Sequence, residues 1–357
     1  MVIPKHMKGV QLIGHGGLDR LVWSDEIATP VPGPGEALVR VLAAGVNNTD
    51  LNTRVGWYSR EVTVGTLAMD PGAAITAGGW SGALRFPLIQ GGDLCGEVVA
   101  LGEGVDALRV GMRVTCPLNQ PMPTAGDPLR VVALGSDRDG AFAQFCLIPA
   151  AQLHDVGPSP LTDVEIAAAP CAHGTALNLL TRAGVGAGDK VLVTGASGGV
   201  GLAAVELASL LGAEVTAKAA RGKHDAVLAA GAAHVLDREA SPAPRSVTAV
   251  IDVVGGPGFA EGLRALAPGG RYAVSGAIAG PVVEADLRII YLNDITIYGC
   301  TYTPREVFER LVGFLNAGAI RPLVSRVYPL RDIAQAQLDF AAKIHPGKLV
   351  LIPPALA

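Results

Sequence analysis

One glycine-rich segment of the chain has residue types and spacing that suit the binding of a phosphate group. It runs from Thr194 to Gly201, reads TGASGGVG, and lies between a short apolar run and a stretch with helical periodicity. At such a turn, glycines let the backbone approach a pyrophosphate, and the following helix offers free amides and the positive end of its dipole. The sequence therefore predicts a dinucleotide-binding turn made of Ala196, Ser197, Gly198, Gly199, Val200 and Gly201.

The match of this turn to the dinucleotide pattern GxGxxG is imperfect, because Ala196 stands at the first position. An ordinary glycine-rich turn is the alternative. The position between a strand and a helix favours the dinucleotide, and a Walker-type nucleotide loop is excluded because no Gly-Lys-Ser or Gly-Lys-Thr follows.

The end of the next predicted strand bears on which dinucleotide binds. Sites for NAD usually place an Asp or Glu about 20 residues further on, where it holds the ribose 2′-hydroxyl. Here the segment 217–224 reads AKAARGKH, with no acid and three cations: Lys218, Arg221 and Lys223. Cations match a 2′-phosphate, so the sequence predicts NADP(H) as the cofactor. A solvated basic loop is the alternative.

The turn and the basic segment lie in a region where short apolar runs alternate with helical periods. Predicted strands cover 191–194, 214–217, 250–254, 271–275 and 295–298, and a helix covers 202–211. Alternating strands and helices predict an α/β fold with a doubly wound parallel sheet. The first ~150 residues instead show short strands bounded by glycine and proline, among them 37–43, 96–102 and 113–116, which is typical of a barrel or sandwich.

Composition limits the possible partners and compartment. The chain has 357 residues, 50% of them hydrophobic, and a net charge of −4, so nothing suggests a nucleic-acid or membrane partner, and a small-molecule substrate is expected. The N-terminus has no signal-like apolar core, and no apolar run is long enough to span a membrane. Five scattered cysteines favour a reducing compartment, so a cytoplasmic location is expected.

The chain resembles the medium-chain dehydrogenase/reductase superfamily over its whole length, and within it the zinc-independent quinone oxidoreductase and enoyl reductase branch. The matching segments are 44–50 (AGVNNTD), 91–99 (GGDLCGEVV), the turn at 196–201 and 268–272 (PGGRY). The resemblance implies a GroES-like catalytic domain over 1–168, a Rossmann domain over 169–300 and a return segment over 301–357 that completes the first domain. It also implies an active site in the cleft and a homodimer formed through Rossmann edge strands such as 295–298.

Zinc members of the superfamily hold the catalytic metal with a Cys, a His-Glu pair and a second Cys. The corresponding positions here are Asn47, Gly92-Asp93 and Cys171, which leaves too few ligands for the usual three. The segment after Cys116 also lacks the four close cysteines of the structural zinc lobe. No metal is therefore expected, and Cys171 is expected to be a buried residue or part of a pocket wall.

The resemblance also assigns the candidate catalytic residues. Asn47 matches a position that faces the nicotinamide ribose or the substrate oxygen. Asp50 is expected to organise the loop, with a simple turn-capping role as the alternative. Tyr58 matches the tyrosine that enoyl reductases place near the reacting double bond, where a phenol can donate a proton to an enolate. An aromatic packing role is its alternative.

Together these features predict hydride transfer from NADPH to an activated C=C bond or a quinone. Metal-free carbonyl or alcohol oxidoreduction remains an alternative, as does an NADPH-binding sensor or structural protein with little turnover. The irregular segment from Tyr58 to Gly91 is long, and either a substrate lid or a subunit contact would explain it.

Overall fold

The structure, a computed structural model, describes residues 2–70, 72, 75 and 77–356, and leaves out the side chain of Leu67. Contacts divide these residues into two units. Unit 1 comprises 1–62, 70–171 and 304–357, and unit 2 comprises 63–69 and 172–303. The domain boundaries expected after residues 168 and 300 lie close to these limits, whereas the assignment of 63–69 to unit 2 was not predicted.

Unit 2 is built on a six-stranded parallel sheet. Its strands are β10 (Lys190–Val193), β11 (Glu214–Ala219), β12 (His234–Asp237), β13 (Val247–Asp252), β14 (Leu266–Val274) and β15 (Thr296–Gly299). Their order in the sheet is β12-β11-β10-β13-β14-β15, with every neighbouring pair parallel. The predicted doubly wound α/β fold is therefore confirmed. The short strand β12 was not predicted, because its four residues include a histidine and an aspartate and show no clear apolar run.

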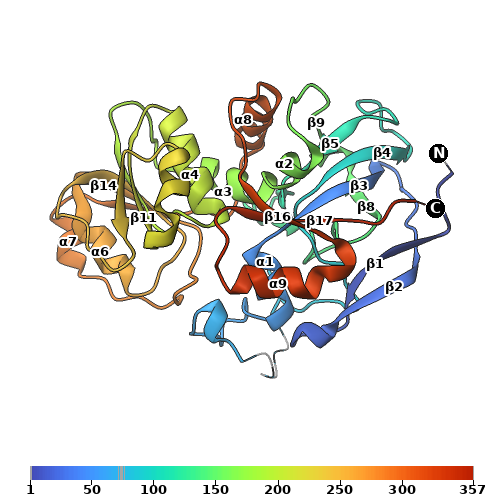
Figure 1. Ribbon diagram of the computed structural model, residues 1–357, viewed down its shortest axis with the longest axis horizontal. Coiled ribbons are helices and arrows are strands. Elements are labelled where there is room, and N and C mark those ends of the chain that lie inside the picture. Colours follow the sequence, from blue (N-terminus) through green and yellow to red (C-terminus); the bar gives the residue numbers. More distant parts are fainter. Residues whose placement is uncertain (1, 71, 73–74, 76, 357) are drawn as a thin grey trace. The chain divides into compact units, whose positions relative to one another are not determined.

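Helices connect these strands and cover the sheet. They are α3 (Pro170–Arg182), which leads into β10, α4 (Gly199–Leu210), α5 (His224–Ala229), α6 (Gly258–Ala265) and α7 (Leu287–Tyr291). Figure 1 shows α4 on one side of the strands and α6 and α7 on the other, as right-handed crossovers on both sides of a doubly wound sheet require. The helix α4 is apolar around most of its circumference, since seven of its residues are buried.

The carboxyl end of β13 is held by a buried polar cluster. Tyr272 donates its phenolic hydrogen to Asp252 Oδ2 (2.6 Å), and Thr194 donates to Asp252 Oδ1 (2.6 Å). The same Oδ1 accepts from the amides of Val254 and Gly255. Because Thr194 begins the glycine-rich segment, this cluster fixes the segment to the neighbouring strand.

Unit 1 contains the β-rich part of the chain and its C-terminal return. Its main sheet has the order β16-β17-β3-β4-β5-β9, and β8 also pairs with β3. The unit's strands are β1 (His6–Leu12), β2 (Leu21–Ala28), β3 (Glu36–Val46), β4 (Cys95–Leu101), β5 (Arg113–Thr115), β6 (Asn119–Pro121), β7 (Val131–Ala133), β8 (Phe145–Pro149), β9 (His154–Asp155), β16 (Val324–Pro329) and β17 (Lys348–Ile352). The β-rich unit of short strands that the sequence predicted for the first ~150 residues is confirmed.

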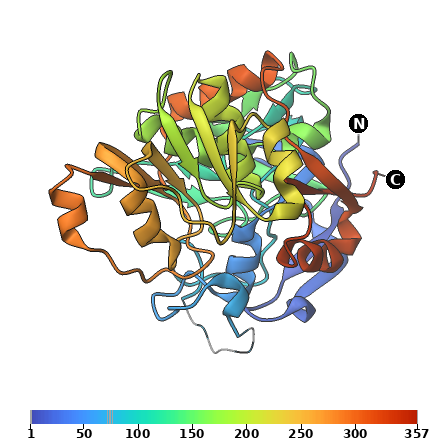
Figure 2. The ribbon, with the colours of Figure 1, turned by 60° about the vertical axis from the view of Figure 1, so that its left-hand side comes forward.

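The return segment joins this sheet directly at β3. Strand β17 runs antiparallel to β3, with Leu349 opposite Val46 and Val350 opposite Gly45. This register places Lys348, the first residue of β17, beside Asn47, the residue that follows β3. Figure 2 shows both ends of the chain on the same side of unit 1.

Four α-helices complete unit 1: α1 (Asn48–Val55), α2 (Asp163–Ala167), α8 (Arg305–Asn316) and α9 (Ile333–Ala341). The helix α1 begins directly after β3 and ends at Gly56, whose φ of 76° is the left-handed conformation that favours glycine at a helix end. The helix therefore leads straight into Trp57 and Tyr58. None of the helices in the described part of the chain combines the length and apolar character of a membrane span.

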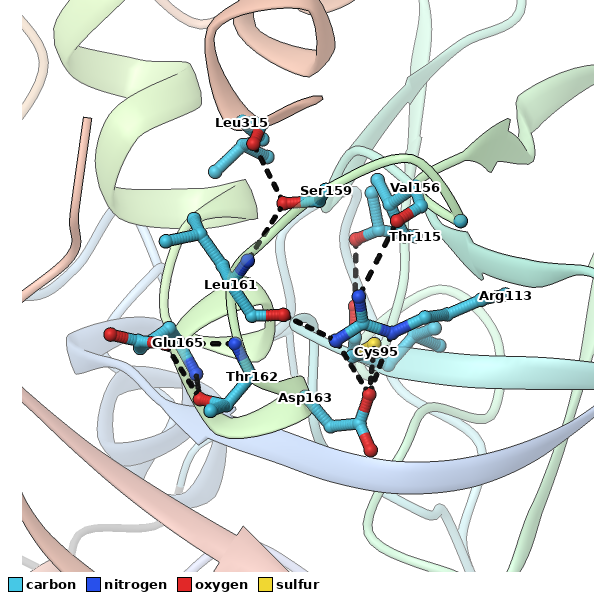
Figure 3. Close-up of polar contacts among 12 residues, drawn as sticks. Cys95, Arg113, Thr115, Val156, Ser159, Leu161, Thr162, Asp163, Glu165 and Leu315 are labelled. Carbon is cyan, nitrogen blue, oxygen red and sulfur yellow. Dashed lines mark hydrogen bonds and ion pairs between the residues drawn. The ribbon is translucent and has the colours of Figure 1, made fainter. Parts of the chain in front are cut away.

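A charged clamp fixes the segment that leads into α2 (Figure 3). Arg113, on β5, donates from Nε to Asp163 Oδ1 (2.7 Å) and from its terminal nitrogens to the carbonyls of Val156 and Leu161. The buried Cys95 thiol lies 3.5 Å from the same carboxylate oxygen. Since α2 packs against β3 and leads to Cys171, the clamp also helps to place the Cys171 backbone.

The long segment from Tyr58 to Gly91 has little regular structure where it is described. It contains one 3-10 turn, η2 (Thr66–Ala68), and Trp80, whose ring packs on Tyr58. Residues 71, 73, 74 and 76 of this segment lie outside the described residues.

Candidate functional site

The predicted dinucleotide turn lies between β10 and α4 in unit 2. Ala196 and Ser197 are buried, Gly198 is exposed as the residue that caps α4, and Gly199, Val200 and Gly201 form the first turn of the helix. Amides in a first helical turn have no partner within the helix. The helix α4 is twelve residues long, and its free amides and the positive end of its dipole face the space beside Gly198. This space suits a pyrophosphate.

Two of the glycines in the turn, Gly198 and Gly201, are needed for different reasons. A Cβ on Gly201 would lie 2.2 Å from the carbonyl oxygen of Gly195, so the fold itself requires glycine there. A Cβ on Gly198 would meet only that same oxygen, at 3.5 Å, which is an ordinary contact. The packing of the protein therefore does not explain Gly198, whereas close approach of a ligand does. The turn fits the dinucleotide that the sequence predicted.

This difference predicts opposite effects for two substitutions. Gly198→Ser should leave the free energy of unfolding nearly unchanged, because serine is a favoured helix cap, but should weaken dinucleotide binding at least tenfold by filling the space for the pyrophosphate. Gly201→Ala should lower the free energy of unfolding by about 1–3 kcal/mol through overpacking. Calorimetric titration and chemical denaturation of both variants test this. Unchanged dinucleotide affinity in Gly198→Ser would show that the pyrophosphate lies elsewhere.

The basic segment after β11 is partly neutralised by acids in unit 2. Lys218 Nζ lies 3.0 Å from Glu261 Oε2, and Arg221 lies 2.7 Å from Asp237 Oδ2. Arg221 is the most accessible of these side chains, with 86% of it exposed, and Lys223 follows in the 3-10 turn η4 (Arg221–Lys223). Where an NAD site has its acid at the end of the second strand, β11 ends at the small residue Ala219, and Ala220 follows it.

In unit 1, the residues at the zinc-ligand positions surround a buried ammonium group. Lys348 Nζ lies 2.9 Å from Asp93 Oδ2 and also donates to Asn47 Oδ1. Asn47 Nδ2 donates to the same Asp93 oxygen (2.8 Å), and the amide of Cys171 donates to Asp93 Oδ1 (2.6 Å). The side chains of Lys348 and Asp93 are 3% and 0% exposed. Both oxygens of Asp93 and both ends of the Asn47 amide are therefore engaged within the protein.

Asp50 lies next to this cluster, in the first turn of α1. Its Oδ2 accepts from the amide of Asn47 (2.7 Å) in a capping box at the start of α1, which is the capping contact considered as the alternative to a wider loop-organising role. Gln90 donates to the Asp50 carbonyl (2.8 Å) and thereby ties α1 to the segment that carries Asp93. Burial raises the pKa of the Asp50 carboxyl to about 7, although the Asn47 amide and the Lys348 charge act in the opposite direction. Near neutral pH this carboxyl is therefore partly protonated.

Tyr58 follows the end of α1, and its ring packs between two tryptophans. The ring centroids lie 5.6 Å from Trp57 and 4.7 Å from Trp80. Burial raises the pKa of the Tyr58 phenol well above its ordinary value, and nearby Cys171 and Asp50 raise it further, so the phenol stays protonated. The structure therefore brings Tyr58 near the Asp50 and Cys171 side chains, with its proton retained.

A row of hydrogen bonds leads from a lysine to the Tyr58 oxygen. Lys343 Nζ lies 3.4 Å from Asn48 Oδ1, and Asn48 Nδ2 lies 3.3 Å from Asn52 Oδ1. The Asn52 side chain in turn hydrogen-bonds to the Tyr58 phenol and lowers its pKa. This hydrogen bond ties the Tyr58 phenol to α1.

The sequence predicted Asn47, Asp50 and Tyr58 but missed the residues that hold them. Lys348, Gln90 and Asn52 were not predicted, and Asp93 was considered only as a metal ligand. A signal existed for two of them. Asn48 and Asn52 lie four residues apart and so share a helix face, and Lys348 is a single charge at the start of an apolar strand, where burial requires a partner.

The chain combines a doubly wound sheet, which carries the glycine-rich turn 196–201, with a GroES-like unit. This combination defines a dehydrogenase-type oxidoreductase that uses a nicotinamide cofactor. The family model "Alcohol dehydrogenase GroES-like domain" matches residues 33–158, and "Zinc-binding dehydrogenase" matches 199–317. The chain belongs to the medium-chain dehydrogenase/reductase superfamily, in its quinone reductase and enoyl reductase-like branch.

Several relatives are similar over nearly their whole length. An acryloyl-coenzyme A reductase of Metallosphaera sedula is 28% identical and covers 91% of this chain and 95% of its own. A quinone oxidoreductase of Rattus norvegicus is 28% identical over 98% of each chain. The crystal structure of a putative alcohol dehydrogenase from Sinorhizobium meliloti 1021 is 42% identical, has a TM-score of 0.88, and covers 99% of this chain and 98% of its own.

The zinc ion implied by the second family model does not fit the residues at the expected positions. Asn47 and Asp93 are already engaged with Lys348, and the positive charge of a metal would have to replace a buried ammonium at the same oxygens. Within the described residues, no group of three or more His, Cys, Asp or Glu side chains could hold a metal ion. The Cys171 side chain is half-buried, and its backbone amide donates to Asp93 Oδ1.

Proposed function

We propose that this chain is an NADPH-dependent, zinc-independent oxidoreductase that reduces an activated carbon–carbon double bond or a quinone. The observation that carries the proposal is the buried cluster of Lys348, Asn47 and Asp93, which uses the chain's own ammonium where zinc members place a metal. The names of the acryloyl-coenzyme A reductase and quinone oxidoreductase relatives support the substrate class. In the reduced form, the nicotinamide cofactor would supply a hydride.

The residues of unit 2 would bind this cofactor. The first-turn amides of α4 would hold the pyrophosphate, and the basic residues after β11 would hold the 2′-phosphate of NADPH. Each hydrogen bond to a charged group contributes about 1.5–3 kcal/mol, which exposure of Arg221 reduces by solvent screening. Two such bonds would still favour NADPH over NADH by up to roughly a hundredfold, at about 1.4 kcal/mol per factor of ten.

The residues of unit 1 would act on the substrate oxygen. Tyr58 would donate a hydrogen bond, and then its proton, to the negative charge that develops on a carbonyl or quinone oxygen. Asn52 would orient the phenol through their hydrogen bond, and Asp50 would hold the start of α1. Lys348, together with Asp93, would hold Asn47 in place.

A substrate panel with a metal control tests the proposal. NADPH oxidation is expected with enones, enoyl thioesters or quinones, more slowly with NADH, and with full activity after treatment with a chelator. Faster reduction of aldehydes or ketones would favour metal-free carbonyl or alcohol oxidoreduction, and the name of the putative alcohol dehydrogenase relative would then support an alcohol or carbonyl substrate. One tightly held zinc per chain, with activity lost on its removal, would contradict zinc independence. Tight NADPH binding without turnover would point to a sensor or structural protein.

We also propose that the chain forms a homodimer through unit 2. Strand β15 ends the order of the sheet, and an edge strand leaves one row of backbone groups free for pairing. Exposed apolar side chains lie on or beside β15 and α7: Val282, Leu287, Tyr291, Leu292 and Ile297. A second copy could pair antiparallel with this edge about a two-fold axis and cover these side chains.

The dimer proposal predicts that one added charge separates the subunits. Leu292→Glu should convert the dimer to a monomer in sedimentation experiments, because dimer formation would bury an unpaired carboxylate. Leu129→Glu, at an exposed leucine of unit 1, serves as the matched control and should leave the dimer intact. A monomeric unaltered protein would refute the proposal.

We further propose a cytoplasmic location, where reducing conditions would keep the five cysteines in the thiol form.

A further inference from the structure

The acid that faces the basic segment is Asp237, at the end of β12. Strands β11 and β12 are parallel, and their last residues, Ala219 and Asp237, lie opposite each other. Arg221 follows β11 by two residues and donates from a terminal guanidinium nitrogen to Asp237 Oδ2 (2.7 Å). The other carboxylate oxygen lies 3.2 Å from His224 Nε2. Asp237 therefore contacts two of the nitrogen groups that surround the expected site of a 2′-phosphate.

The two partners of this ion pair differ in exposure, and the pairing keeps Asp237 negatively charged. Arg221 lowers the pKa of the Asp237 carboxyl, so the acid is ionised at neutral pH. The Arg221 side chain is 86% exposed, against 32% for Asp237, so the guanidinium is free to turn toward another anion while the carboxylate stays on its strand. A phosphate bound to Arg221 would consequently have the Asp237 charge within a few ångströms.

We propose that Asp237 is a specificity-determining residue that limits affinity for NADPH by holding Arg221 in an ion pair which the 2′-phosphate must break. This inference rests on the proposed function, since it requires a 2′-phosphate to bind beside Arg221. Carboxylate and phosphate compete for the same guanidinium donors, and like charges at short distance repel each other. NADH has no such phosphate, so the pair should not affect its binding. Asp237 thereby reduces the ratio of NADPH affinity to NADH affinity.

Binding of two small fragments isolates this interaction from catalysis. Adenosine 2′,5′-bisphosphate carries the 2′-phosphate, whereas 5′-AMP lacks it. In titration calorimetry at about pH 8, where a phosphate monoester carries nearly two negative charges, Asp237→Asn should tighten binding of the bisphosphate about 3–10-fold. Affinity for 5′-AMP should stay within about twofold. Unchanged or weaker bisphosphate binding in Asp237→Asn would overturn the inference.

Two further variants identify the cause. Glu214→Gln removes a comparable charge, paired with His234, at the opposite end of β11, and should leave both affinities unchanged. Arg221→Ala should weaken bisphosphate binding, and adding Asp237→Asn to it should give a smaller gain than in the unaltered protein. If Asp237→Asn increased bisphosphate affinity equally with and without Arg221→Ala, Asp237 would act only by charge repulsion of the phosphate. That result would overturn the ion-pair mechanism.

The same titrations separate this inference from the proposed function. If the unaltered protein binds the bisphosphate no better than 5′-AMP, and Asp237→Asn leaves it so, the proposed NADPH preference fails. If it prefers the bisphosphate but Asp237→Asn has no effect, the preference stands and only the role of Asp237 fails.

Discussion

Tyr58→Phe is expected to lower kcat for reduction of an enone or enoyl thioester by about 10²–10³-fold, the scale for losing one preorganised donor or general acid. Hydride delivery leaves negative charge on the substrate oxygen, so a donor aimed at that oxygen stabilises the transition state more than the ground state. Because phenylalanine keeps the ring between Trp57 and Trp80, the free energy of unfolding should fall by about 1 kcal/mol or less.

The measurement should use NADPH deuterated at the transferred position, so that an isotope effect shows that the chemical step is being observed. Tyr328→Phe is a matched control, because it removes another hydrogen-bonded phenol of unit 1, one that donates to Asp339. The control should leave kcat and the KM for NADPH unchanged. A deficit of only about tenfold in Tyr58→Phe would indicate that water supplies the proton. Unaltered kcat with a full isotope effect in both proteins would remove Tyr58 from the mechanism.

Lys348→Met should lower the free energy of unfolding by about 3–5 kcal/mol, the usual cost of leaving one partner of a buried ion pair alone. Asp93 would keep only the Asn47 and Cys171 donors, with no exposed surface from which water could compensate. Adding Asp93→Asn should recover part of the loss, because the neutral amide does not need a buried counter-charge. Chemical denaturation of the single and double variants measures both effects.

Lys8→Met supplies the control for this experiment. Lys8 lies 4.0 Å from Asp25 at the surface of the same unit, with 45% of its side chain exposed. Such pairs contribute about 0–1 kcal/mol, so its loss should be nearly silent. If Lys348→Met were equally silent, the ammonium would not be a fixed part of the cluster.

The sequence predicted the parts of the fold whose signals are local. The turn 194–201 combines a strand, glycines and a helical period within a few residues, and β10, β11, β13, β14 and β15 each contain closely spaced apolar or β-branched residues. Strand β12 reads HVLD, so its two apolar residues are enclosed by a histidine and an aspartate and give only a weak signal. Its place at the sheet edge, where one side needs no partner strand, makes this composition tolerable.

The candidate site was harder to predict because its contacts join distant segments. Asn47 and Asp50 lie at the start of α1, five and two residues before Asn52, which contacts Tyr58. In contrast, Asp93, Cys171 and Lys348 come from three other parts of unit 1. Only the antiparallel register of β17 on β3 brings Lys348 beside Asn47. Similarly, Arg221 can pair with Asp237 because β12 lies beside β11. Since the sequence did not predict β12, it also did not predict that an acid faces the predicted cations.

The register of β17 on β3 has a consequence for the order of events during translation. Asn47 and Lys348 are separated by 301 positions, so at about 5–20 residues per second the ribosome needs about 15–60 s to pass from one to the other. Unit 2, whose strands all lie between residues 190 and 299, can assemble within that interval. The nascent first half of unit 1, by contrast, must wait with Asp93 lacking its counter-charge and with the end of β3, residues 44–46, lacking the strand that pairs with it. A chaperone that acts on the growing chain would therefore find a binding site at this end of β3, and β17 would cover that site once it is synthesised.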